Sequence, residues 1–104
     1  PIYRFVSFGE AVIDHFHREV TLNNRLLDLT SVEFNLLSRL IEASPEPVSA
    51  RTLVKAALGY DTSDAEAGEI IKVYIHHLRQ KVEPQPSKPV YIKTVRHQGY
   101  LWCN

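Results

Sequence analysis

The stretch EIIKVYIHHLRQKV, residues 69–82, has the apolar spacing of an amphipathic helix. At about 100° per residue, four apolar side chains fall within one narrow arc, which predicts a stripe facing the core. These side chains are Ile71, Ile75, Leu78 and Val82. The helix is expected to stop soon afterwards, because prolines follow at positions 84, 86 and 89.

The opposite face of this helix is polar apart from one valine. It presents Glu69, Val73, His76, His77 and Gln80, with Lys72 and Arg79 at its edges. Such a face suits a DNA major groove, because cations can neutralise phosphates, polar groups can reach base edges and valine can contact a thymine methyl. The alternative is an ordinary solvated face with one exposed valine. Protonated histidines would add positive charge to the face, whereas neutral ones would only hydrogen-bond.

Charge is unevenly distributed along this chain of 104 residues, although its formal net charge is zero. Residues 1–71 carry 6 basic and 11 acidic side chains, and residues 72–104 carry 6 basic and one acidic. This asymmetry fits a polyanionic partner for the C-terminal part, or simply an uneven solvated surface. The single cysteine, Cys103, favours a reducing compartment. No apolar run is long enough to cross a bilayer, so we expect no membrane partner.

Residues 1–29 have the pattern of short antiparallel strands. YRFVSF, AVID and EVTL are rich in strand-forming residues, and Asn23-Asn24 can form a two-residue hairpin turn. At residue 30 the pattern changes to helices. Thr30 and Glu33 have the spacing of a capping box, and the first helix is expected to end within SPEP, residues 44–47.

A second helix is expected to begin after Ser49 and to end at Gly59. Its predicted buried stripe comprises Leu53, Ala56 and Ala57. A second capping box, Ser63 with Glu66, places the start of the third helix there. The order of strands, three helices and a final hairpin over 90–103 predicts one α+β domain, a winged helix-turn-helix.

The final hairpin adds a second basic element next to the third helix. Its turn is expected at 97–99, between strands 90–95 and 100–103. The sequence KTVRHQGY brings four polar or basic side chains near one tip: Lys93, Thr94, Arg96 and His97. An arginine on such a tip can enter a minor groove, where a narrow groove concentrates negative potential.

The chain resembles the effector domain of OmpR/PhoB-type response regulators. The resemblance covers nearly the whole chain and rests on LTSVEFNLL (29–37), VSARTL (48–53), VYIHHLRQKVEP (73–84) and YIKTVRHQGYLW (91–102). It implies a four-stranded N-terminal antiparallel sheet (1–29), a three-helix bundle (30–83) and a C-terminal hairpin wing (90–103). It also implies sequence-specific binding to double-stranded DNA and regulation of transcription in a bacterial cytoplasm.

In full-length members of this family a receiver domain precedes the effector domain, here before residue 1. The resemblance therefore implies a sensor kinase that acts through the receiver, dimer formation on DNA, and contact with RNA polymerase. The polymerase-contact loop would comprise Tyr60, Asp61, Thr62, Ser63 and Asp64. The recognition helix, about 69–83, would enter the major groove, and the wing, 91–103, would lie at the minor groove.

By this resemblance, the residues expected to bind DNA combine the two basic elements with the start of the second helix, where backbone amides can meet a phosphate. They are Ser49, Arg51, Lys72, Val73, His76, His77, Arg79, Gln80, Lys93, Thr94, Arg96 and His97. Some positions depart from the family pattern. Basic residues are common where this chain has His76, His77 and Glu69, and Ala50 replaces a usual arginine, with Arg51 one step away. We therefore expect weaker and less salt-dependent DNA binding than in a typical member.

Another departure lies in the wing turn, where His97 replaces the usual glycine and makes the turn conformation an open question. Leu58 likewise stands where tryptophan is frequent. A rival interpretation is a winged-helix module that binds protein, which would need an exposed apolar patch of Ile70, Val73 and Tyr74.

We expect neither an enzyme nor a cofactor. Cys103 has no evident catalytic partner or elbow motif, and no glycine-rich phosphate loop occurs in the sequence. His15 and His17 would share a face if they lay on a strand, near Asp14 or Glu19. A metal site needs three or four convergent ligands, so this pair alone predicts none.

Overall fold

The computed structural model describes residues 4–103, and its elements follow the predicted order of strands, helices and hairpin. The N-terminal strands are β1 (Phe5–Phe8), β2 (Ala11–Asp14), β3 (Glu19–Leu22) and β4 (Arg25–Leu26). The helices are α1 (Ser31–Ala43), α2 (Ala50–Leu58) and α3 (Asp64–Val82). The wing consists of β5 (Ile92–Val95) and β6 (Gly99–Trp102). The predicted α+β winged helix-turn-helix is confirmed; Tyr3, expected in the first strand, lies outside the described residues.

The N-terminal strands form an antiparallel sheet in the order β1-β2-β3-β4. The β3–β4 hairpin turns through Asn23 and Asn24, whose φ angles are 52° and 62°. Asparagine tolerates this left-handed conformation, so the predicted turn is confirmed. Alternate residues of β2 and β3 are buried, among them Ala11, Ile13 and Val20, and this pattern turns one face of the sheet toward the helices.

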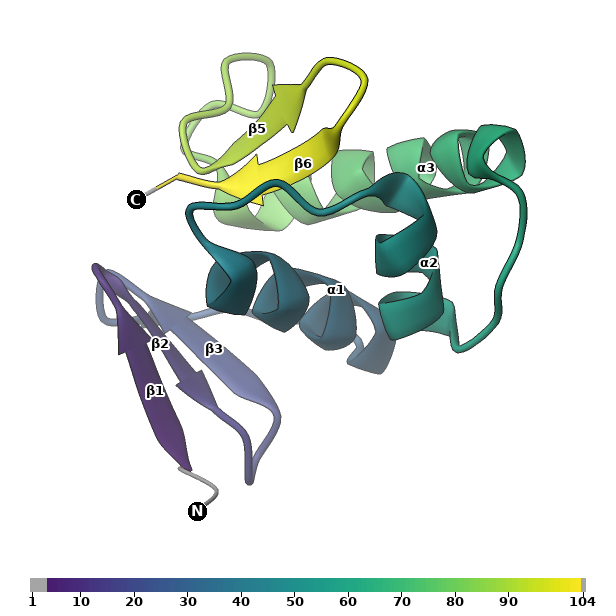
Figure 1. Cartoon of the computed structure of the whole chain (residues 1–104). Helices are drawn as coiled ribbons and strands as arrows, with labels where there is room; N and C mark the ends of the chain where they lie inside the picture. Colours follow the sequence, from purple (N-terminus) through teal and green to yellow (C-terminus); the bar gives the residue numbers. More distant parts are fainter. Residues whose placement is uncertain (1–3, 104) are drawn as a thin grey trace.

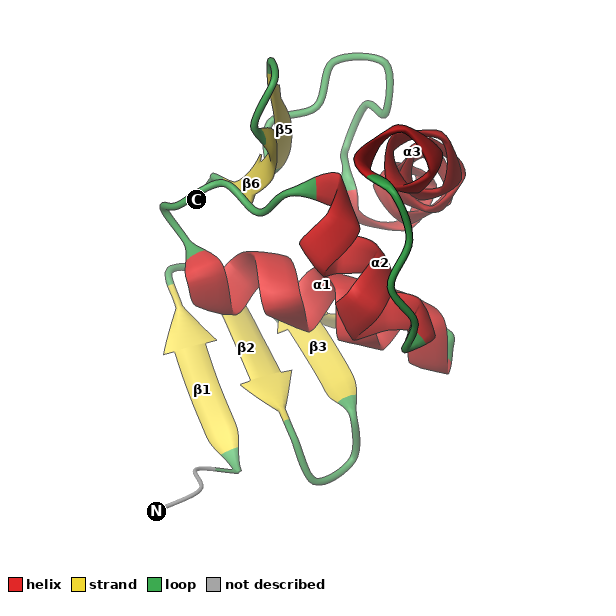
Figure 2. Ribbon diagram, turned by 45° about the vertical axis from the view of Figure 1, so that its right-hand side comes forward, coloured by secondary structure: helices red, strands yellow, loops and turns green. Residues whose placement is uncertain are grey.

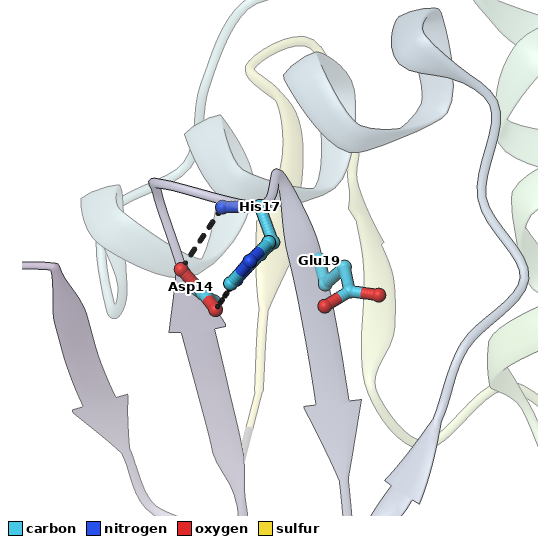
Figure 3. Close-up of side chains that lie close together, drawn as sticks. All are labelled: Asp14, His17 and Glu19. Carbon is cyan, nitrogen blue, oxygen red and sulfur yellow. Dashed lines mark hydrogen bonds and ion pairs between the residues drawn. The ribbon is translucent and has the colours of Figure 1, made fainter.

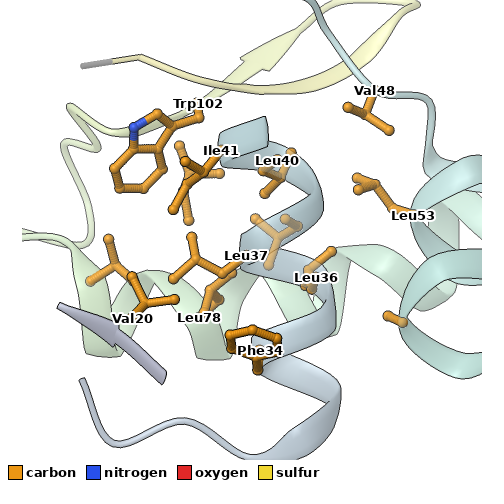
Figure 4. Packing of buried hydrophobic residues seen from close by; sticks show 14 of the residues in the cluster. Val20, Phe34, Leu36, Leu37, Leu40, Ile41, Val48, Leu53, Leu78 and Trp102 are labelled. Carbon is orange, nitrogen blue, oxygen red and sulfur yellow. The ribbon is translucent and has the colours of Figure 1, made fainter. Parts of the chain in front are cut away.

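Helix α1 forms the central layer of the molecule (Figures 1 and 2). The sheet packs against one side of it, and α2, α3 and the wing lie on the other side. Side chains from all these elements meet in one cluster, in which Phe34, Leu37 and Leu78 pack together with Trp102 of the wing (Figure 4). The position of the wing relative to α3 is therefore fixed by the same core that holds the sheet.

Local sequence signals account for the ends of the helices. The Thr30–Glu33 capping box is present in both directions, and Gly59 ends α2 with a φ of 82°. Ser63 caps α3, but Glu66 does not close a second box because its carboxylate accepts a hydrogen bond from the Thr62 hydroxyl instead. The prediction of a capping box there is therefore only half right.

Helix α2 turns a slightly different face inward from the one predicted. Leu53 and Ala57 are buried as expected, but Val54 is buried and Ala56 only half-buried. Positions 53, 54 and 57 lie on one arc of a helix, and the branched valine side chain removes more apolar area from water than the alanine methyl. On α3 the predicted stripe is confirmed, because all four of its residues are buried.

The carboxylate of Glu83 joins the end of α3 to the start of the wing. Glu83 is buried, and its two oxygens accept hydrogen bonds from the backbone N–H groups of Val90 (2.8 Å), Tyr91 (3.1 and 3.2 Å) and Ile92 (2.7 Å). Strand β5 begins at Ile92, two residues after the predicted Val90. The wing strand thus starts from a fixed position beside the end of the helix.

A short backbone bridge holds the wing, close to its turn, against the connection between α1 and α2. Val48 N–H donates to the Tyr100 carbonyl at 2.7 Å, and Tyr100 N–H donates to the Val48 carbonyl at 3.0 Å. Gly99 permits this approach, because a Cβ atom there would lie 1.9 Å from the Val48 oxygen. Strand β6 accordingly runs over Gly99–Trp102, one residue earlier than predicted.

Within residues 4–103, no helix has both the length and the apolar character needed to cross a membrane.

A second buried carboxylate links α1 to α3. Glu33 Oε1 accepts hydrogen bonds from the Thr30 N–H at 2.9 Å and from Lys81 Nζ at 2.6 Å. Burial alone would raise the pKa of the Glu33 carboxyl, but the hydrogen bonds from Lys81 and Thr30 outweigh burial and hold this pKa below its ordinary value of 4.5. The interaction thus favours the ionised carboxylate in the folded state.

Replacing Glu83 with alanine should lower the free energy of unfolding by about 3 kcal/mol, because the backbone N–H groups of residues 90–92 lose their acceptor. Urea denaturation followed by circular dichroism measures this loss. The matched control is Glu46→Ala at an exposed position, which should change stability by less than about 0.5 kcal/mol. Equal effects of the two substitutions would contradict a bracing role for Glu83.

Replacing Glu33 with glutamine should lower the free energy of unfolding by about 2 kcal/mol near neutral pH. The pKa of Glu33 is depressed on folding, so its contribution is complete above the unfolded pKa and is lost as pH falls through the folded pKa. The difference between parent and variant should therefore shrink below about pH 4.5. Urea titrations at a series of pH values test this. A difference that stays constant with pH would count against the ion pair with Lys81.

Candidate nucleic-acid interface

The outward face of α3 is exposed along the length predicted for DNA contact. Val73 exposes 54% of its surface, and His76, His77 and Gln80 are also exposed. The two imidazole rings are inclined to each other with centroids 5.9 Å apart. Lys72 Nζ lies 3.6 Å from a carboxylate oxygen of Glu69, which partly offsets its charge. The face therefore offers hydrogen-bonding groups and one apolar contact, with little net charge.

Arg79, at the edge of this face, connects α3 to the wing. It is half-buried, and its guanidinium donates to the Ile92 carbonyl at 2.8 and 3.3 Å and to Thr94 Oγ1 at 3.1 Å. The guanidinium carbon also lies 5.9 Å from the centre of the Tyr100 ring. Arg79 was predicted to contact DNA backbone; its position gives it a bracing role within the protein as well.

The turn of the wing places Arg96 and His97 at an exposed tip. His97 has a φ of 66°, so the histidine adopts the left-handed conformation that a glycine would provide. The turn is closed by a hydrogen bond of 3.0 Å from Gln98 N–H to the Val95 carbonyl. Within residues 4–103, the Arg96 guanidinium pairs with no carboxylate. Its charge is therefore available to an anionic partner.

A groove of about 740 Å³ lies between the start of α2, the N-terminal half of α3 and the wing turn, and residues of all three line it. It brings together six of the twelve residues predicted to bind DNA: Ser49, Arg51, Lys72, Thr94, Arg96 and His97. A second hollow, of about 370 Å³, lies on the wing side of α3 and is lined by Lys72, His76, Arg79 and Gln80. The structure thus gathers side chains from three separate sequence segments on one side of the molecule.

Two predicted residues occupy different surroundings. Lys93 is exposed on β5 but lies on the opposite strand face from Thr94, because neighbouring strand residues alternate in direction. Arg51 points into the groove but is paired with Asp61. In the loop predicted to contact polymerase, Tyr60, Asp61, Ser63 and Asp64 are exposed and Thr62 is half-buried.

Tyr100 lines both the groove and the second hollow, although it is not among the residues predicted to bind DNA. It is half-buried on β6, directly across from Thr94 on β5. The hairpin pattern could have identified Tyr100. Residues that pair directly across two antiparallel strands lie on the same face, so Tyr100 lies on the face that carries Thr94.

A separate group of ionisable residues lies at the β2–β3 turn, far along the chain from this surface. One potential ligand atom from each of Asp14, His17 and Glu19 lies within 4.8 Å of the others (Figure 3). Arg4 also contacts the group, with Nη2 3.0 Å from His17 Nδ1 and Nε 3.5 Å from an Asp14 oxygen. The Arg4 guanidinium thus already balances the negative charge of Asp14 in this group.

Asp14 organises this turn. Burial would raise the pKa of the Asp14 carboxyl, but hydrogen bonds from the His17 side chain and from the backbone of His17 and Phe16, together with Arg4, lower that pKa to about 2. The expectation that His15 and His17 share a strand face is wrong, because both lie in the turn. His15 lies 3.4 Å from a Glu42 oxygen, whereas His17 lies 2.8 Å from Asp14.

A known family and several solved structures match this chain. Residues 23–102 match the family described as "Transcriptional regulatory protein, C terminal". The RstA DNA-binding domain of Klebsiella pneumoniae, crystallised in complex with the RstA box, is 29% identical, has a TM-score of 0.82, and aligns over 97% of this chain and 98% of its own.

Two longer proteins align in the same way. The Thermotoga maritima response regulator DrrB, an OmpR/PhoB homologue, is 26% identical with a TM-score of 0.79, over 97% of this chain and 45% of its own. The probable transcriptional regulator ycf27 of Porphyra purpurea is 36% identical over 102 residues. The chain spans 42% of the length of this last relative.

Proposed function

The chain belongs to the family of C-terminal domains of transcriptional regulatory proteins of the OmpR/PhoB type, and from this premise we propose that it binds double-stranded DNA sequence-specifically and regulates transcription. The observation that carries the proposal is the convergence of the start of α2, the outward face of α3 and the wing turn on one side of the molecule. It acts as the effector domain of a two-component response regulator.

Helix α3 enters the major groove through its exposed face. His76, His77 and Gln80 hydrogen-bond to base edges and nearby phosphates, and Val73 contacts a thymine methyl. The buried stripe of α3 faces the interior, where the helix packs mainly against α2 and also against α1, so the opposite face is the one available to a partner. Lys72, at the rim of both hollows, neutralises phosphates.

The wing turn lies at the adjacent minor groove, with Arg96 as the inserted cation and Thr94, His97 and Lys93 as supporting contacts. Ser49 opens α2 and offers backbone amides to a phosphate. Arg79 holds the wing at its distance from α3, so it supports DNA contact partly by positioning.

For the whole protein, the family supports further proposals. A receiver domain precedes this domain, receives the signal of a sensor kinase, and drives dimer formation on DNA in a bacterial cytoplasm. The loop from Tyr60 to Asp64 contacts RNA polymerase. The exposure of Tyr60 and of two carboxylates in this loop supports that role.

The rival function, binding of a protein through an apolar patch on α3, has less support. Of the three residues that would form the patch, Val73 is exposed, but Ile70 and Tyr74 are half-buried and pack against the core. A single exposed valine is common on protein surfaces and does not make a contiguous apolar patch.

Replacing Arg96 with alanine should weaken binding to an A/T-rich duplex by about tenfold, because the minor groove loses its inserted cation. Fluorescence anisotropy with a duplex selected by the parent protein from a random-sequence pool measures the change. The matched control is Arg25→Ala at an exposed position of β4, which should bind like the parent. Equal losses from both substitutions would show that net charge, and not the wing, governs binding.

Replacing Val73 with aspartate should weaken binding to the selected duplex at least about 100-fold, because a carboxylate then faces bases and phosphates. Leu26→Asp, on the exposed surface of the sheet, makes the same type of change and should leave affinity nearly unaltered. Circular dichroism verifies that both variants fold. Parent-like binding by a folded Val73→Asp variant would exclude α3 as the recognition element.

A further inference from the structure

Arg51, in the first turn of α2, is held by an acidic side chain from the connection between α2 and α3. Its Nε lies 2.8 Å from Asp61 Oδ1, and its Nη2 lies 2.9 Å from Asp61 Oδ2. A second carboxylate, that of Asp64, lies 3.9 Å from Nη1. Two parallel hydrogen bonds use the fork of the guanidinium in the geometry that arginine also uses to hold phosphate.

This pair lies at the edge of the proposed DNA-binding groove. Arg51 and Asp64 line the groove together with Ser49 and Arg96. Arg51 and Asp61 also line a smaller hollow on the outer side of α2, with Lys55. A phosphate that approaches the start of α2 therefore meets a guanidinium already occupied by a carboxylate.

We propose that Asp61 is an internal competitor of DNA: its carboxylate occupies the Arg51 guanidinium in the free protein and must be displaced when Arg51 contacts a phosphate. The inference rests on the proposed DNA-binding function and adds a residue that sets affinity. Asp61 thereby lowers affinity and reduces the salt dependence of binding, because the charge of Arg51 is neutralised before the DNA arrives.

The exposure of the pair permits this exchange. The side chains of Arg51 and Asp61 are 49% and 58% exposed, and ion pairs in such surroundings are weak. The hydrogen bond from Arg51 lowers the pKa of the Asp61 carboxyl, so the competitor stays ionised at neutral pH. A phosphate of the duplex also offers two acceptor oxygens for the guanidinium fork, and its neighbouring phosphates attract Arg51 more strongly than a single carboxylate does.

The test compares single and double variants in binding to a random-sequence duplex of about 20 base pairs, by fluorescence anisotropy at several salt concentrations. Asp61→Asn should bind about fivefold more tightly than the parent, and log K against log salt should steepen by about 0.9. Asp64→Asn, which removes the same charge from the first residue of α3 but no short hydrogen bond to Arg51, should give a clearly smaller gain.

The gain from Asp61→Asn should disappear when Arg51 is also replaced by alanine, because the competitor then has nothing to block. Equal gains in affinity from Asp61→Asn and Asp64→Asn, or a gain that persists without Arg51, would mean that any lost negative charge strengthens binding. Either result would overturn the inference. Weaker binding by Asp61→Asn would overturn it too, since the pair would then serve to order the loop.

Failure of the inference is distinguishable from failure of the proposed function. If Arg96→Ala weakens binding while the Asp61 and Arg51 variants bind like the parent, the DNA-binding function stands and only the competitor is wrong. If the parent chain binds no duplex at low salt, the proposed function fails first.

Discussion

The buried carboxylate of Glu83 is the contact on which the geometry of the proposed DNA-binding side depends. Helix α3 and the wing are separate elements joined by a proline-rich connection, and proline supplies no backbone N–H to a hydrogen-bond ladder. The side chain of Glu83 replaces that missing ladder by accepting from the backbone of residues 90–92. A charged acceptor forms stronger hydrogen bonds than a neutral one, which suits a junction that has to be stiff. Arg79 reinforces the same junction one turn earlier on the helix, where it binds the Ile92 carbonyl.

This bracing gives Glu83 and Arg79 structural roles within the protein. Without these roles, an acidic residue would be unfavourable near a DNA-binding surface, and an arginine would be free to contact phosphates. Glu83 is the one acidic residue after position 71, and it is buried. The Arg79 guanidinium donates its hydrogen bonds within the protein, to the Ile92 carbonyl and to Thr94 Oγ1. The charges that remain at the surface are few, and two of them, Lys72 and Arg51, have acidic neighbours. A surface of this kind favours recognition through hydrogen bonds and shape over attraction by net charge.

Much of the fold was predictable because its signals are local in the sequence. Thr30, Ser63 and Gly59 mark helix ends through their own hydrogen-bonding and backbone preferences, and the stripe of α3 follows from helical periodicity. Contacts between distant segments were not predictable in this way. Glu83 reads as an ordinary helix-end residue, and the partner of Arg51 depends on how the α2–α3 connection bends. The choice of Val54 over Ala56 as a buried residue depends on the rotation of α2 against its neighbours.

The backbone bridge between Val48 and Tyr100 bears on how this protein can diverge from its relatives. Its two hydrogen bonds join main-chain atoms, so they are indifferent to the side chains beside them. Residues at the rim of the groove can be exchanged over generations while the frame that spaces them persists. The exception is Gly99, where any side chain would strike the Val48 carbonyl. Side chains at the surface can thus change without rearranging the interior, provided that this one glycine is kept.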